Sequence, residues 1–149
     1  MRRSFLALIL MLVLPVAVLP STAVAAPSRI VILTSAEAAD AWRLCEIGSR
    51  RAQGLRYNYL GDKAAKSLFS EEAPPAFFFA ITPLTVATAT LVSESWRKPI
   101  IHYSVLPQDD ANTLEETLHA RTREAALNVL NNPALRGKTI VMVWDRRHI

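Results

Sequence analysis

The stretch TIVMVWDRRHI, residues 139–149, decides the fold. Together with Lys138 it begins with a mostly apolar run, 138–144, which has the length and composition of a strand. Because nearly all of its residues are apolar, we expect this strand to be buried. Charged and ionisable side chains follow directly at 145–148, so the strand carries polar chemistry to its carboxyl end.

Working outward, the chain alternates between predicted strands and predicted helices. The further strands are expected at 29–34, 76–81 and 98–106, the first of them buried on both faces. Helical patterns lie at 48–61, 84–96 and after residue 108, where Thr113 and Glu116 have the spacing of a capping box. This alternation predicts an α/β fold, a three-layer α/β/α sandwich with a largely parallel sheet.

Ligands of such sheets bind beyond the carboxyl ends of the strands. The segments that follow the four predicted strands are therefore expected to line a pocket. They are residues 34–35, 82–83, 105–108 and 145–148.

The first 25 residues have the composition of a signal peptide. Arg2 and Arg3 form a basic start, residues 5–19 are an uncharged apolar run, and residues 23–25 supply small side chains for a peptidase. The run is shorter than the roughly 20 residues of a membrane span. We therefore expect cleavage and a single periplasmic or secreted domain at 26–149. The alternative is an uncleaved leader that anchors the domain to a membrane through residues 5–19.

Composition excludes several classes of function. The formal charge of +4 falls to +2 without the two arginines of the leader, which is a weak footprint for nucleic-acid binding. Cys45 is the only cysteine, so no internal disulfide forms. No spacing of His, Cys or carboxylate residues fits a metal site, and we expect neither a metal nor another cofactor.

Four segments together resemble the histidine phosphatase superfamily, the phosphoglycerate mutase-like proteins. IVILTSAE (30–37) is similar to the opening strand of that family, which normally ends in Arg-His-x-Glu. LCEIGSRRAQGLRYNYL (44–60) resembles its Leu-Ser-x-x-Gly-x-x-Arg-Ala-x-x-Leu segment, and AITPLTVATAT (80–90) fits the region that follows. GKTIVMVWDRRHI (137–149) resembles the late strand before the second catalytic histidine. The resemblance implies a phosphoglycerate mutase-like fold from residue 29 onward.

The resemblance also implies a chemistry whose residues are substituted here. In the family a histidine attacks phosphorus, while two arginines and a second histidine hold the phosphate oxygens. Thr34 and Ser35 stand at the positions of the first arginine and the nucleophilic histidine. Val86 falls near the second arginine and Arg146 at the second histidine, so only Glu37 matches. The family is one of phosphohydrolases and phosphomutases, and we expect this chain to have lost the phosphohistidine reaction.

Ser35 and Cys45 are the candidate substitute nucleophiles. Ser35 needs a base within hydrogen-bond reach, and His102 and His148 are the nearest candidates by strand-end position. Cys45 is a nucleophile only with a depressed pKa, and a packing role is the plainer interpretation. His102 is expected to be structural and His119 to be solvated on a helix.

Arg146 is the strongest candidate for binding rather than catalysis. A guanidinium at a strand end can hold a phosphate or carboxylate in a bidentate grip, although it could instead pair with Asp145 or Glu37. Family members also continue beyond this last strand, whereas this sequence ends at Ile149. We therefore expect an exposed apolar face or sheet edge. Either a protein partner or a second subunit covers it, or the chain is a truncated gene product.

The leading hypothesis is an exported, inactive histidine-phosphatase-like domain that binds a small anion or a protein partner. One alternative is an active exported phosphomonoester hydrolase with non-standard residues. The other is a membrane-tethered interaction module.

Overall fold

A computed structural model describes residues 26–149, and the predicted signal peptide at 1–25 lies outside them. Four strands form one sheet in the order β1-β4-β2-β3, and every neighbouring pair is parallel. The strands are β1 (Arg29–Thr34), β2 (Pro75–Ala80), β3 (Ile100–His102) and β4 (Thr139–Trp144). The prediction of an α/β chain with a parallel sheet is confirmed.

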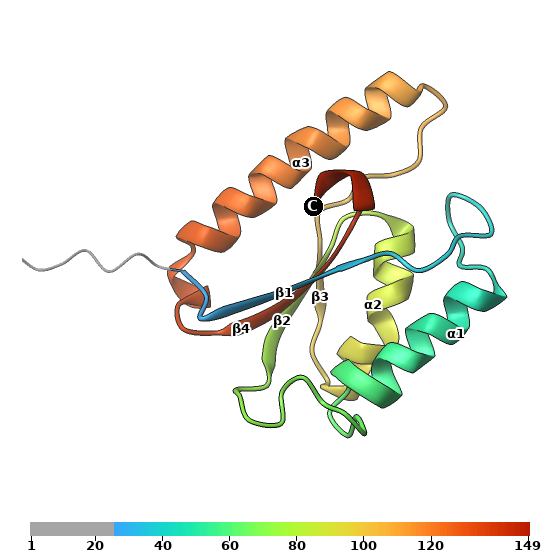
Figure 1. Ribbon diagram of the computed structural model, residues 1–149. Helices are drawn as coiled ribbons and strands as arrows, with labels where there is room; N and C mark the ends of the chain where they lie inside the picture. Colours follow the sequence, from blue (N-terminus) through green and yellow to red (C-terminus); the bar gives the residue numbers. More distant parts are fainter. Residues whose placement is uncertain (1–25) are drawn as a thin grey trace, which may run out of the picture.

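Helices cover both faces of this sheet (Figure 1). They are α1 (Glu46–Gly54), continued by the π-helical turn η1 (Leu55–Leu60), α2 (Pro83–Ser95) and α3 (Ala111–Asn131), with short 3-10 turns η2 (Pro133–Leu135) and η3 (Arg146–His148). Crossovers between parallel strands are right-handed, so the direction of travel across the sheet decides the face. The connections from β1 to β2 and from β2 to β3 cross the sheet in the same direction, so α1 and α2 lie on the same face. The return from β3 to β4 places α3 opposite.

Strand β4 lies between β1 and β2, and all six of its residues are buried. Alternate residues point to opposite faces of a strand. Ile140, Met142 and Trp144 join the hydrophobic cluster under α3, whereas Val141 joins the cluster under η1 and α2. The prediction of a buried strand at 138–144 is confirmed, and its cover lies on both faces.

Two indole groups fasten helices to the rest of the fold. Trp144 donates from Nε1 to Thr122 Oγ1 of α3 at 2.9 Å, and Trp96 donates from Nε1 to the carbonyl of Leu60 at 2.6 Å. Each bond satisfies a polar group that burial would otherwise leave without a partner. The first bond fixes α3 over the carboxyl half of β4.

The prediction that β1 is buried on both faces is wrong. Strand β1 is an edge strand with one neighbour, and its residues alternate between half-buried and exposed. Ile30 is 36% exposed and Ile32 is 49% exposed. A run of β-branched residues is compatible both with a central strand and with an edge strand that is uncovered on one face. The sequence pattern therefore could not distinguish the two positions.

Other predicted boundaries also changed. The strand expected at 98–106 is limited to Ile100–His102, and Ser104 adopts a left-handed φ of 50° soon after it. The capping box of Thr113 and Glu116 is wrong, because Asp110 is the N-cap of α3 and accepts from the Thr113 N–H at 2.8 Å. The helix expected at 48–61 begins at Glu46, with the Cys45 sulfur as its N-cap acceptor.

Gly48 allows α1 to approach the loop after β1. A Cβ atom at this position would lie 2.1 Å from the carbonyl oxygen of Glu37, a backbone atom that cannot turn aside. That carbonyl also accepts from the Cys45 N–H at 2.9 Å. Gly48 therefore sets the distance between α1 and the residues that follow β1.

We predict that Gly48→Ala destabilises the fold by about 2–3 kcal/mol, because the methyl group forces backbone apart. Gly54→Ala is the matched control, since its Cβ would meet only Asn58 Nδ2 at 3.8 Å. That substitution should stabilise by about 0.5–1 kcal/mol through helix propensity. Urea unfolding of both variants measures the difference. Equal stability of the two variants would show that the close approach to Glu37 is relaxed in solution.

The Asp110 cap predicts a pH dependence. Donation from the side chain and the backbone of Thr113 holds the pKa of Asp110 below its usual value, so its carboxylate stabilises α3 above about pH 4 and this contribution is lost as pH falls through the lowered native pKa. We expect Asp110→Ala to lower Tm by a few degrees at neutral pH, with Asp110→Asn, which keeps an acceptor, closer to the unaltered chain. Thermal unfolding, followed by circular dichroism, should show the Tm values of Asp110→Ala and of the unaltered chain converging in acid. A constant difference down to the acid limit would assign the loss to something other than the carboxylate.

Candidate functional site

The carboxyl ends of β1, β2 and β4 surround a cavity of about 170 Å³, here termed the carboxyl-end cavity. Its polar lining consists of Ser35, Thr82, Asp145 and Arg147, and the rest is mainly apolar. The apolar lining is Ala41, Leu84, Val105, Pro107, Leu114 and Leu118. All four segments predicted from the strand ends contribute to it.

Ser35 reaches the cavity because β1 runs on by one residue. Its N–H donates to the carbonyl of Trp144 at 3.2 Å, which keeps Ser35 in register with the end of β4. The next N–H, of Ala36, donates to the buried hydroxyl of Thr88 on α2 at 2.9 Å. These two bonds hold the Ser35 backbone between β4 and α2.

The loop that supplies Ala41 is closed by Asp40. Its carboxylate accepts from the N–H groups of Trp42 and Arg43, both at 2.8 Å, and from the Arg43 guanidinium at 2.6 Å. Hydrogen bonding from the Arg43 side chain, followed by the Trp42 N–H, holds the pKa of Asp40 below its ordinary value. This loop is thus a compact wall of the cavity.

Thr82 comes from the start of α2. It is the N-cap of the helix, where its hydroxyl accepts from the Thr85 N–H and Thr85 in turn accepts from the Thr82 N–H. Pro83 occupies the first helical turn, where a missing N–H costs nothing. The positive end of the α2 dipole is therefore directed toward the cavity side of the sheet.

Asp145 and Arg147 form the charged side of the cavity. The Asp145 carboxylate accepts from the Arg147 N–H at 3.0 Å and from Arg147 Nε at 3.3 Å, which makes Asp145 the N-cap of η3. Arg147 also pairs with Glu115 of α3 at 3.1 Å. Its guanidinium is therefore held between two carboxylates at the mouth of the cavity.

The residues placed by the family resemblance are not brought together. Of Thr34, Ser35, Glu37, Val86 and Arg146, only Ser35 lines the carboxyl-end cavity. Thr34 and Arg146 are exposed, and Val86 is half-buried within α2. The arginine at the cavity is Arg147, one residue beyond the position that the resemblance indicated, because the 3-10 turn after β4 directs it there.

Glu37 belongs to a separate cluster with α1. Its carboxylate pairs with Arg51 at 2.7 Å, and its backbone touches Gly48 and bonds to Cys45. Its other carboxylate oxygen, Oε2, is buried without a hydrogen-bond partner in the described part of the chain. Glu37, Gly48 and Arg51 are residues on which the resemblance rests, and they hold the loop after β1 against α1.

No imidazole lines the carboxyl-end cavity among residues 26–149. His102 lies at the end of β3, where Nε2 is 3.1 Å from the carbonyl of Ile81. His148 pairs with Glu115 at 3.1 Å and stacks on His119, with 6.4 Å between the ring centroids. Cys45 is engaged at the start of α1, so none of these groups is positioned to activate Ser35.

The part of the chain that the structure describes holds no group of three or more His, Cys, Asp or Glu side chains arranged for a metal ion. Within the same residues, no helix combines the length and the apolar character needed to cross a membrane.

Comparison with known proteins adds no relative. No family model matches the sequence, and no similar protein was found among curated proteins or among solved structures.

Proposed function

We propose that residues 26–149 are an exported domain, similar to the phosphoglycerate mutase-like proteins, that has lost phosphohistidine chemistry and binds a small phosphate- or carboxylate-bearing molecule in the carboxyl-end cavity. Two features support the likeness in fold. The sheet is wholly parallel, and the Glu37, Gly48 and Arg51 positions of two separate motif segments are in contact.

One observation carries the functional part of the proposal: the cavity has a cation but no imidazole. Arg147 is a bidentate donor that suits phosphate or carboxylate oxygens, and the start of α2 adds positive potential on the same side. The hydroxyls of Ser35 and Thr82 supply neutral polar groups. This set can recognise an anion without reacting with it.

Asp145 limits the strength of this binding. It lines the same cavity and its carboxylate lies 3.3 Å from Arg147 Nε, so an incoming anion competes with it for the guanidinium. The carboxylate of Glu115 also pairs with Arg147 and offsets more of its positive charge. We therefore expect weak, millimolar binding of a simple anion, with tighter binding only for a molecule that also fills the apolar walls.

Loss of catalysis follows from the same residues. A serine hydroxyl is a poor nucleophile at neutral pH without a base in contact, and phosphoryl transfer needs cations around the developing charge. Ser35 has no histidine beside it, and the one cavity arginine is already paired. The alternative of an active phosphomonoester hydrolase rests on Ser35, which stands at the position of the nucleophilic histidine and lines the cavity.

We expect the purified chain to hydrolyse an aryl phosphate no faster than a buffer control, and Ser35→Ala to change nothing. The assay follows release of the coloured aryl alcohol across neutral and acid pH. Turnover that disappears in Ser35→Ala would establish Ser35 as a nucleophile and overturn the proposal of an inactive domain.

Neighbouring arginines allow a matched test of anion binding. Phosphate at about ten times its Kd should raise the free energy of unfolding by about 1.4 kcal/mol, seen as a rise in Tm. Arg147→Gln should remove this phosphate-dependent rise, whereas Arg146→Gln should keep it. Asp145→Asn, which retains a capping oxygen, should enlarge it.

Each variant is compared with itself, with and without phosphate, so that a change in intrinsic stability does not enter. If the phosphate-dependent rise in Tm is kept in Arg147→Gln but lost in Arg146→Gln, the anion binds at the exposed Arg146 instead. No rise in the unaltered chain would remove the binding proposal.

The proposed export rests on the leader at residues 1–25. Mass spectrometry of the protein recovered from its producing cell tests it. A chain that begins at Ala26 supports an exported domain, and an intact Met1 supports the membrane-tethered interaction module instead.

A further inference from the structure

Strand β1 offers a row of backbone groups on its outer side. Arg29 and Ser35 both donate their N–H groups toward β4. Along a strand, alternate residues direct their N–H and C=O groups to the same side, so Ile30, Ile32 and Thr34 direct theirs away from β4. Within residues 26–149, none of these three N–H groups has a hydrogen-bond partner.

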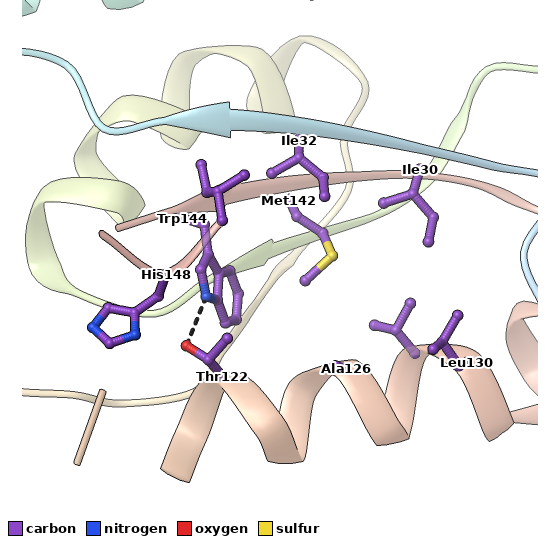
Figure 2. A pocket seen from close by; sticks show the side chains of 10 residues that line it. Ile30, Ile32, Thr122, Ala126, Leu130, Met142, Trp144 and His148 are labelled. Carbon is purple, nitrogen blue, oxygen red and sulfur yellow. Dashed lines mark hydrogen bonds between the residues drawn. The ribbon is translucent and has the colours of Figure 1, made fainter. Parts of the chain in front are cut away.

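Ile30 and Ile32 also border an apolar groove of about 200 Å³ between β1 and α3, here termed the β1 groove. Figure 2 shows Ile30 and Ile32 on one side, Ala126 and Leu130 on the other, and Met142 between them. Leu130 is 46% exposed and Ile149, also in the lining, is 65% exposed. An unpaired sheet edge and an apolar face therefore coincide.

Strand β1 has none of the features that protect a sheet edge. Edge strands are usually short, bulged, or broken by charge or proline. Strand β1 pairs with β4 in one continuous register, and its single charge, Arg29, lies at its start and is paired with Glu72. The opposite edge is protected, because β3 has only three residues and is followed by the left-handed Ser104. The exposure of β1 is thus specific to one edge.

We propose that a second copy of this chain covers this edge, with β1 antiparallel to β1 of the partner subunit and the two-fold axis at Ile32. Ile32 then faces Ile32 of the partner subunit, and Ile30 faces Thr34 of the partner subunit. All three outward residues of each strand are paired, and they exchange six backbone hydrogen bonds. The two four-stranded sheets become one sheet of eight strands.

Side chains and charges fit this register. A two-fold axis perpendicular to the sheet keeps α3 of both copies on the same face, so the two β1 grooves open onto each other. Arg29 faces Ser35 of the partner subunit, so no like charges meet. Two paired six-residue edges form a small interface compared with the standard size of a stable complex. The surface therefore suits a copy of itself, and the association should be reversible.

The first test is the mass of the purified chain in solution by analytical ultracentrifugation. We expect a dimer at micromolar concentration. Ile32→Lys should shift the chain to monomer, because it places two ammonium groups at the axis. Ile101→Lys is the control, since Ile101 is 40% exposed on the opposite edge, and this variant should remain a dimer. Circular dichroism confirms that both variants are folded.

A second test does not depend on breaking the interface. In a Cys45→Ser background, Ile32→Cys brings two thiols together at the axis, and mild oxidation should give a covalent dimer. Ile101→Cys should not. A monomeric unaltered chain would overturn the proposal. Equal loss of dimer in both lysine variants, or cross-linking through Ile101 alone, would also overturn it.

Discussion

The burial of β4 between β1 and β2 is the constraint on which the rest of the fold depends. It is the last strand in the chain, but it takes an interior position, and it contributes apolar side chains to the clusters on both faces. To reach that position the chain must travel back across the sheet from β3, and the right-handed crossover rule then places α3 alone on its face. The insertion of one strand thus determines the layers, the edge and the carboxyl-end cavity together.

The charged residues of the carboxyl-end cavity follow directly after β4. Residues after β4 enter a 3-10 turn that Asp145 caps, and the turn holds Arg147 between Asp145 and Glu115. The guanidinium of Arg147 keeps the geometry for oxyanion recognition, but the two carboxylates offset its positive charge. The histidines are held elsewhere, His102 at the end of β3 and His148 against α3. This arrangement is the basis of the proposal that the cavity binds an anion without reacting with it.

The strand-end rule located the cavity from the sequence, whereas the sequence did not determine which side chains line it. The strand-end rule named four segments, and residues from each of them line the cavity. The motif placed Arg146 at the site, but a turn of three residues rotates Arg147 there instead, and a backbone turn of this kind cannot be read from residue types. The same limit applies at Asp110, where one of several adjacent polar residues became the helix cap. Strand order was equally hidden, because the apolar pattern of β1 does not reveal which neighbour it has.

Dimensions explain why β1 remains exposed. Four strands spaced by about 4.8 Å form a sheet close to 19 Å wide, whereas a helix with its side chains is about 10 Å across. On one face α1, η1 and α2 share the width, but on the other α3 stands alone. Trp144 holds α3 through Thr122, and Phe77 and Tyr103 extend the cluster toward β2 and β3. Helix α3 therefore leaves Ile30 and Ile32 partly exposed within residues 26–149, and these side chains belong to the surface that the proposed dimer covers.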